Sequence, residues 1–321
     1  MMPHQSDEDD FFGTICMAVY RPDPDLLKVQ LDSIKAQSVK TWRCLVGIDG
    51  TDPATAALLR AAIGEDSRFT VLAFDENVGF YRNFERLLSE VEATSSWIAL
   101  ADQDDRWYPE KLATLLPALV NASLVTGAAR VVDKDGVSSG VTARAYRGLT
   151  ALMVDNQVTG SLAVFRRDLL DIALPFPEPT DVAYHDHWLG VAAASTGGVI
   201  LDPRVVQDYV QHDANVIGEE ESTSIVARSQ ALMSSSAGGP RAMIGYLRIH
   251  RWGWRVNMAH SLRSKLSTMP PSVAQVMDAF SVRGRALRAS RLITIAVVTR
   301  RAPAARGCAL ILGALVGGAQ A

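Results

Sequence analysis

Apolar and polar positions follow two different rhythms along the first 110 residues. Short apolar runs rich in β-branched residues predict strands at 14–21, 42–49, 69–75 and 97–102. Between these runs, apolar residues recur at helical spacing and predict helices at 23–37, 54–64 and 80–91. Alternating strands and helices are typical of an α/β fold with a doubly wound, mostly parallel sheet. Ligands of such sheets bind at the carboxyl ends of the strands, so we expect a site there.

The pattern is more mixed beyond this region. Candidate strand and helix pieces at 123–133, 161–170 and 197–202 are broken by Gly and Pro. The segment SSSAGGP at 234–240 predicts a flexible junction before a helical tail. We therefore expect an acidic N-terminal tail over 1–13, an α/β domain over 14–221 and a mainly helical C-terminal extension over 222–321.

Composition narrows the class of protein. A chain of 321 residues with 48% hydrophobic residues supports a large packed core. Cys16, Cys44 and Cys308 are too few and too scattered for a disulfide framework or a CxxC metal site, which fits a reducing compartment. The first 13 residues are acidic and lack the basic and apolar regions of a signal peptide, so we expect cytoplasmic residence.

The net charge of -3 conceals a strong asymmetry. Residues 222–321 contain 14 Lys and Arg but one acid, Asp278, whereas residues 1–221 contain 18 bases and 34 acids. The body therefore carries about -16 and the tail about +13. Such a split suggests a tail that faces a polyanionic surface.

The stretch IALADQDDRW, at 98–107, ends an apolar strand in three crowded acids, Asp102, Asp104 and Asp105. Carboxylates this close disfavour each other's ionisation, so a cation is expected among them. The alternative is a strand that surfaces into an acidic loop, with Pro109 and Glu110 opening the next helix.

Seven segments between about 14 and 218 together resemble family 2 glycosyltransferases, which have the GT-A fold. The resemblance is closest to the bacterial rhamnosyltransferase-like members that build surface polysaccharides. In chain order the segments are VYRPD, IDGTDP, NVGFYRNF, ADQDDRW, VTGSLAVFRR, HDHW and QHDANVIG.

The resemblance implies a site for a nucleotide-sugar and a divalent cation, Mg²⁺ or Mn²⁺. DQD matches the family's DxD motif, with Asp104 as a direct metal ligand, Asp102 near the ribose or a metal-bound water, and His212 completing the metal contacts. The nucleotide-sugar pocket would be formed by Ala18, Tyr20, Asp49, Arg82, Asp102 and Gln103.

Several of these residues also have ordinary structural interpretations. Asp49 before Gly50 suits a turn, Tyr20 a packing aromatic, Arg82 a helix surface and His212 a loop. A zinc site at His185, His187 and His212 is disfavoured, because the spacing matches no standard zinc signature.

By the same resemblance, Asp186 in HDHW would remove the proton from the acceptor hydroxyl. A sugar hydroxyl does not ionise near neutral pH, so a positioned base lowers the barrier. The alternative is that Asp186 caps a helix running through HWLGVAAAS. Thr159, Gly160, His185 and Trp188 would form the acceptor or sugar pocket.

The implied reaction is metal-dependent, inverting transfer of a sugar from dTDP-rhamnose or a UDP-sugar to a glycan or lipid-linked glycan. A nucleotidylyltransferase is disfavoured, because RPDPD follows the first strand where that class has a glycine-rich loop. A catalytically inactive nucleotide-sugar-binding or scaffold protein of the same fold is the second alternative.

The tail places Arg241, Arg248 and Arg255 at seven-residue intervals, with Trp252 and Trp254 nearby. On a regular helix these arginines share one face, which suits an anionic membrane surface. Apolar patches at 292–298 and 308–318 are too short to span a bilayer, so peripheral attachment is expected. The alternative is packing on the acidic α/β domain. Nucleic acid is not an expected partner, because no recognised binding module accompanies the charge.

Overall fold

The computed structural model describes residues 12–142, 144–211, 239–281 and 286–317. Its described residues cluster into two compact units. The first comprises residues up to 146 together with 157–176 and 185–210. The second comprises 147–156, 177–184 and the chain from 211 onward. Two short segments inside 14–221 thus cluster with the C-terminal helices.

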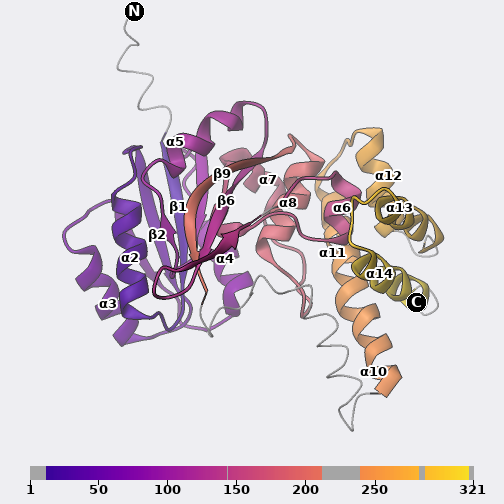
Figure 1. Cartoon of the computed structure of the whole chain (residues 1–321), viewed down its shortest axis with the longest axis horizontal. Coiled ribbons are helices and arrows are strands. Elements are labelled where there is room, and N and C mark those ends of the chain that lie inside the picture. The colour runs from indigo at the N-terminus through magenta and orange to yellow at the C-terminus, as the bar shows by residue number, and fades with distance from the viewer. Residues whose placement is uncertain (1–11, 143, 212–238, 282–285, 318–321) are drawn as a thin grey trace, which may run out of the picture. The chain divides into compact units, whose positions relative to one another are not determined.

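A mixed sheet forms the centre of the first unit (Figure 1). Its strand order is β3-β2-β1-β4-β8-β6-β9-β5, with β7 paired to β6. The strands β1 to β4 run parallel, as the alternation of strands and helices predicts. Their bounds are Gly13–Val19 for β1, Trp42–Ile48 for β2, Phe69–Ala73 for β3 and Trp97–Ala101 for β4.

Helices cover both faces of these parallel strands. Ile15, Met17 and Val19 of β1 belong to a core cluster with Leu27 and Leu59 of the first two helices. The opposite face carries the third helix, because an added Cβ on Gly47 would lie 2.7 Å from Leu87. The bounds are Pro24–Lys35 for α2, Pro53–Ile63 for α3 and Gly79–Ser89 for α4.

Local sequence explains where α2 and α3 begin. Asp23 and Asp52 are the N-caps, and each is followed by a proline at the first helical position. The Asp23 carboxylate accepts from the backbone N–H of Asp25 (3.0 Å), and that of Asp52 accepts from Ala54 N–H (3.0 Å). An acidic cap followed by proline satisfies free N–H groups and presets φ for the helix.

The second half of the sheet mixes strand directions. β8 lies antiparallel between β4 and β6, while β9 runs parallel to β6. The strand bounds are Arg106–Trp107 for β5, Leu124–Val132 for β6, Ser138–Val141 for β7, Ala163–Arg166 for β8 and Val199–Val210 for β9. The helical segments are α5 at Lys111–Leu115, η1 at Leu116–Val120, η2 at Gly160–Leu162, η3 at Arg167–Leu169, α7 at Leu170–Ala173 and α8 at His185–Ser195.

The second unit is helical. Its elements are α6 at Leu149–Val154, α10 at Gly239–Tyr246, η4 at Leu247–Trp252, α11 at Gly253–Lys265, α12 at Pro271–Ser281, α13 at Ala286–Val298 and α14 at Ala304–Gly317. Within the described ranges, none of these helices combines the length and the apolar character that a membrane crossing requires.

The expected arginine face of the tail requires correction. Arg255 is buried, and its guanidinium donates to the carbonyls of Met153 (2.8 Å) and Val154 (3.0 Å) at the end of α6. Burial lowers the pKa of Arg255 to about 9. Trp254 is also fully buried. The π-helical turn η4 interrupts the regular helical period on which the shared face depended. Residues 234–238 of the predicted junction lie outside the described residues, and the Arg241 side chain is not described.

Candidate active site

Polar side chains gather where the parallel strands end. Tyr20 follows β1, Asp49 follows β2, and the acidic loop Asp102–Asp105 follows β4. Gln103 connects two of these ends, because Tyr20 N–H donates to Gln103 Oε1 (2.8 Å) and Gln103 Nε2 donates to Tyr20 O (3.1 Å). The Gln103 amide thus fixes the acidic loop against the end of β1, with the Tyr20 ring 47% exposed.

Asp49 holds the beginning of α4. Its carboxylate accepts from the backbone N–H groups of Val78 (2.9 Å) and Gly79 (2.8 Å) and from Arg86 Nη2 (2.7 Å). Val78, the residue before the helix, offers no side-chain cap, and Gly79 has a φ of +79° that favours glycine. Asp49 therefore has a structural role, but its carboxylate binds the start of α4 and Arg86 rather than the turn at Gly50. A carboxylate has about four acceptor sites, so capacity is left for one nucleobase N–H.

Arg82 and Ala18 lie near this region with different surroundings. Arg82 Nη1 donates to Glu85 Oε2 (2.6 Å) in the next turn of α4. Glu85 in turn accepts from the backbone N–H of Phe176 (2.6 Å) through its other oxygen. Ala18 is half-buried near the end of β1. Because side chains alternate along a strand and Val19 faces the core cluster, Ala18 lies on the sheet face that carries α4.

A network of buried polar side chains contacts the acidic loop on its buried side. The Lys111 ammonium donates to the carbonyl of Ser161 and to Gln207 Oε1 (2.6 Å). Gln207 Nε2 then donates to Asp105 Oδ2 (2.7 Å) and to Ser161 Oγ (3.1 Å). Lys111, Asp105 and Gln207 are fully buried, and the Lys111 ammonium lies 3.6 Å from the centre of the Trp107 ring. The positive charge of Lys111 therefore offsets part of the repulsion among the crowded carboxylates.

The protonation of this network is shaped by burial. Burial, followed by the charges of Asp102 and Asp104, raises the pKa of Asp105 well above its ordinary value. Burial lowers the pKa of Lys111, against the opposing effect of Asp105 and Asp102. Asp105 Oδ1 has no hydrogen-bond partner among the described residues.

Asp102 and Asp104 form the outer part of the acidic loop, and both are half-buried. Burial and then the charges of Asp104 and Asp186 raise the pKa of Asp102 to about 7. In the part of the chain that is described, no three His, Cys, Asp or Glu side chains form a metal-binding group. Mg²⁺ is commonly bound by one or two carboxylates together with phosphate oxygens, so these two acids fit a cation shared with a diphosphate. His212, the third predicted metal contact, lies outside the described residues.

Asp186 lies in the first turn of α8, one residue inside the helix rather than before it. Its Oδ1 accepts from the backbone N–H of His187 (2.7 Å) and its Oδ2 from that of Gly160 (3.2 Å). The Asp186 charge acts on Asp102, so the acidic loop and the predicted base belong to one cluster. Both carboxylate oxygens are oriented by backbone groups.

His185 is buried between this cluster and α4. Its ring stacks on Phe84 at 4.0 Å between ring centres, and neither ring nitrogen has a hydrogen-bond partner among the described residues. Burial lowers the pKa of His185 to about 3, so the imidazole is neutral at physiological pH. An added Cβ on Gly160 would lie 2.6 Å from His185 Nε2, which explains a glycine at that position.

Thr159 and Trp188 occupy different environments. Thr159 is half-buried and precedes η2, next to the backbone that binds Asp186. Trp188 is fully buried, and its Nε1 donates to Ala173 O (2.9 Å). The indole thus packs in the interior of the first unit and presents no exposed surface to a sugar.

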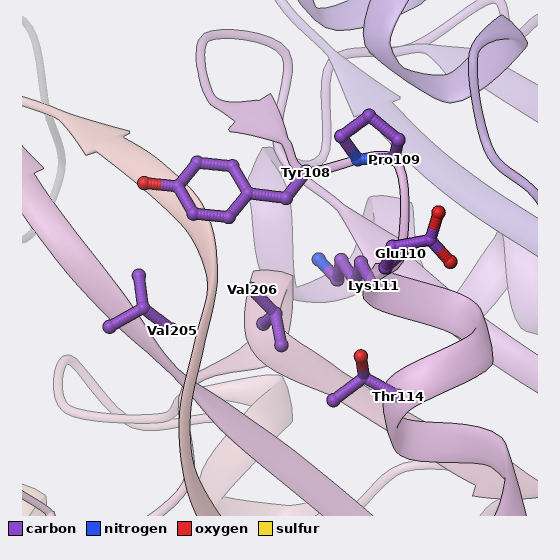
Figure 2. A pocket seen from close by; sticks show the side chains of 7 residues that line it. All are labelled: Tyr108, Pro109, Glu110, Lys111, Thr114, Val205 and Val206. Atoms are coloured by element: carbon purple, nitrogen blue, oxygen red, sulfur yellow. The ribbon is translucent and has the colours of Figure 1, made fainter.

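A pocket of about 340 Å³ is lined in part by Lys111 (Figure 2). None of the residues predicted from the sequence as donor, acceptor or metal contacts lines it. Its lining residues are Tyr108, Pro109, Glu110, Lys111, Thr114, Val205 and Val206.

Comparison with known proteins places this geometry in a family. The model of the family described as Glycosyl transferase family 2 matches residues 14–171, which include β1 except its first residue, β2 to β4 and the acidic loop. The chain carries a glycosyl transferase family 2 domain. Glycosyl transfer is the activity that the description of this family names.

Solved structures share the fold of this glycosyl transferase family 2 domain. The mannosyltransferase PcManGT from Pyrobaculum calidifontis, in complex with GDP-Man and Mn²⁺, has a TM-score of 0.52 at 16% identity. That match covers 95% of this chain and 86% of the other. S. aureus TarS 1-349, in complex with UDP-GlcNAc, has a TM-score of 0.55 at 12% identity and covers 96% and 90% of the two chains. The GT-A fold predicted from the sequence is confirmed.

One curated relative matches over a shorter stretch. It is "Uncharacterized protein y4gI" of Sinorhizobium fredii, 33% identical over 107 residues. The match covers 33% of this chain and 12% of the relative, so the chain spans only a small part of that relative's length.

Sequence reasoning missed two residues of the first unit, Lys111 and Gln207. A lysine in the first turn of a helix, after Pro109 and Glu110, has the pattern of a solvent-exposed residue. The available signal was the position of Gln207 in the mainly apolar run VVQDYV at 205–210, which forms the end of β9. A polar residue inside a buried strand needs partners, and Lys111 is one of them.

Proposed function

We propose that this domain transfers a sugar from a nucleotide-sugar to an acceptor hydroxyl, with inversion at the anomeric carbon. The observation that carries the proposal is that η2 connects Asp186 to the acidic loop. Gly160 N–H donates to Asp186, and Gln207 donates both to the neighbouring Ser161 Oγ and to Asp105. The two backbone bonds to Asp186 orient its carboxylate as a base toward the acceptor hydroxyl.

In this proposal, Asp104 and Asp102 hold Mg²⁺ or Mn²⁺ together with the donor diphosphate. The bound cation supplies electrostatic stabilisation of the negative charge on the departing nucleotide diphosphate. Residues of the chain accept the proton and hold the acidic loop in place. Asp186 accepts the proton of the attacking hydroxyl, Gln103 and Tyr20 hold the acidic loop at the end of β1, and Lys111 supports the loop from below.

The donor is proposed to be dTDP-rhamnose or a UDP-sugar, and the acceptor a glycan or lipid-linked glycan of a cell-surface polysaccharide. Ala18, Tyr20, Asp49 and Arg82 would contact the nucleotide, and Thr159, Gly160 and His185 the sugars. The enzyme would act in the cytoplasm, peripherally at the inner face of the plasma membrane. The structural relatives that bind GDP-Man and UDP-GlcNAc support a nucleotide-sugar but leave the nucleotide open.

The first test is calorimetric titration of the protein with UDP, dTDP, GDP and ADP, each with Mn²⁺ and again with EDTA. Binding of UDP or dTDP that requires Mn²⁺ is expected. If no nucleotide binds under either condition, the proposed donor site is wrong.

The second test separates an enzyme from an inactive binding protein. Asp186→Asn should reduce turnover by about 10² to 10⁴, the usual contribution of a general base, while nucleotide affinity is unchanged. Glu65→Gln, at an exposed position of the same unit, is the matched control. Unchanged turnover in Asp186→Asn would remove this residue from the mechanism.

A further inference from the structure

The helix α13 exposes three large aliphatic side chains. Its buried positions are Ala289, Ile293 and Ala296. Leu287 and Val298 are each 75% exposed, and Ile295 is 50% exposed. These three residues lie within one face of the helix, because positions three, four, seven and eight apart in sequence are neighbours on it.

The helix α14 also exposes large aliphatic side chains, although its Leu310 is buried. Gly307 and Gly313 lie on its inner side, where an added Cβ would lie 2.4 Å from Val297 and 2.6 Å from the carbonyl of Leu247. Leu312 and Leu315 are about half exposed, on the same side as the exposed thiol of Cys308. The only charged residue of α14, Arg306, pairs with Asp155 of the same unit. The outer face of α14 therefore carries no charge.

The two helices pack against one another (Figure 1) and together form what we name the α13–α14 face. It consists of Leu287, Ile295, Val298, Cys308, Leu312 and Leu315. Water-soluble helices ordinarily place large aliphatic residues inward, as Ile293 and Leu310 are placed here. The five further large aliphatic residues that are about half or more exposed suit a surface with an apolar partner.

Arginines lie within and beside the α13–α14 face. Arg288 and Arg291 are exposed on α13, and Arg300 and Arg301 are exposed in the turn between the helices. The sequence from 279 to 321 contains seven arginines and no acid. A partner of this face must therefore combine an apolar interior with negative charge at its surface.

A second copy of the chain does not meet that requirement at this face. Two such faces brought together would oppose arginine to arginine, with no acid of 279–321 to compensate. Nucleic acid would meet the arginines but not the exposed aliphatic residues. A bilayer that contains anionic lipids supplies both an apolar layer and negative headgroups.

We propose that the α13–α14 face docks on an anionic lipid bilayer, with Leu312, Leu315, Ile295 and Val298 entering the headgroup boundary. Arg288, Arg291, Arg300 and Arg301 would contact lipid phosphates. This inference names the surface that would bind the membrane in the proposed function. It rests on the proposed function only for its biological purpose. Vesicle binding requires no turnover, so the two ideas fail separately.

The native cysteines provide the probe. Cys16 and Cys44 are buried, so an environment-sensitive thiol dye reacts at the exposed Cys308 on the α13–α14 face. Vesicles of phosphatidylglycerol and phosphatidylcholine in equal amounts should shift the emission of the dye to the blue. Pure phosphatidylcholine should produce a much smaller shift. Equal shifts with both vesicles would refute the anionic requirement, and no shift would refute docking at this face.

Unlabelled protein gives the independent measurement by vesicle co-sedimentation. Leu312→Ser with Leu315→Ser should weaken binding at least about tenfold, since each change removes apolar area from the bilayer. Arg288→Gln with Arg291→Gln should weaken binding to anionic vesicles only. Val120→Ser and Arg60→Gln, at exposed positions of the first unit, are the matched controls.

Folding and self-association are checked in the same samples. Circular dichroism melting establishes that each variant is folded, and a variant that does not fold is replaced by the single change Leu315→Ser. Light scattering reports the oligomeric state. A dimer that dissociates in the Leu312 and Leu315 variant, without loss of vesicle binding, would assign the face to a second copy and overturn the proposal.

Discussion

The Lys111 ammonium lies 2.6 Å from Gln207 Oε1, although 96 residues separate the two in sequence. Gln207 Nε2 in turn donates to Asp105 Oδ2, and Lys111 also donates to the carbonyl of Ser161. The lysine is thus bound between β9 and η2, and its charge acts on both Asp105 and Asp102. The loop of crowded acids is therefore supported from inside the fold by a buried lysine and a buried glutamine.

Replacing Lys111 should therefore destabilise the protein. Lys111→Met leaves Gln207 Oε1 and the carbonyl of Ser161 without this donor, and a buried polar group left unsatisfied costs about 1–3 kcal/mol. The change also removes the positive charge that acts on Asp105. Urea unfolding followed by circular dichroism measures the loss. Adding Asp105→Asn should restore part of the stability, and Lys134→Met, at an exposed position, controls for the substitution. Equal stability of Lys111→Met and the parent would show that the network is not structural.

The same residues show where sequence reasoning succeeds and where it stops. Asp23-Pro24 and Asp52-Pro53 begin helices through contacts two or three residues away, so the first 110 residues could be predicted from local pattern. The burial of Lys111 depends on Ser161, 50 residues away, and on Gln207. No local pattern contains that information.

The tail illustrates a second limit. A seven-residue spacing predicts a common face only if the helix is regular, and η4 interrupts it before Arg255. The carbonyls left free at the end of α6 then bind the Arg255 guanidinium. The location of the apolar patches was predictable, but which of their residues face outward depends on the packing of α13 on α14.

Asp49 and Arg86 should be energetically coupled. The ion pair of 2.7 Å joins a buried carboxylate to a partly exposed guanidinium, and the same carboxylate caps α4. A double-mutant cycle with Asp49→Asn and Arg86→Met should give a coupling free energy of about 1–3 kcal/mol in denaturant unfolding. Additive effects of the two changes would mean that the pair contributes no mutual stabilisation.

Nucleotide titration of these variants separates structure from recognition. If Asp49 also accepts from the nucleobase, Asp49→Asn should weaken UDP or dTDP binding more than Arg86→Met does. Equal weakening would attribute the whole effect to the position of α4.

Metal affinity should rise with pH. The pKa of Asp102 is raised to about 7 by burial and by neighbouring acids, so a proton competes with the cation on this carboxylate. Between about pH 6 and about pH 8 the ionised fraction of Asp102 rises about tenfold, and the Mn²⁺ affinity should rise by a similar factor. Calorimetric Mn²⁺ titration in the presence of UDP or dTDP measures it. Asp102→Asn should abolish most of the pH dependence, and an unchanged profile in that variant would place the titrating group elsewhere.

His185 should make the fold sensitive to acid. Its folded-state pKa is lowered to about 3 by burial, whereas an unfolded histidine has a pKa of about 6.5. The unfolded chain therefore binds a proton below about pH 6.5 that the folded chain does not, so stability falls as pH falls. The loss amounts to about 2 kcal/mol at about pH 5, and His185→Phe, which keeps an aromatic ring against Phe84, should remove it. Denaturant unfolding of both proteins at about pH 7 and about pH 5 tests this, with the exposed His260→Phe as the matched control. If the parent and His185→Phe lose the same stability over that interval, the imidazole is not held neutral in the folded state.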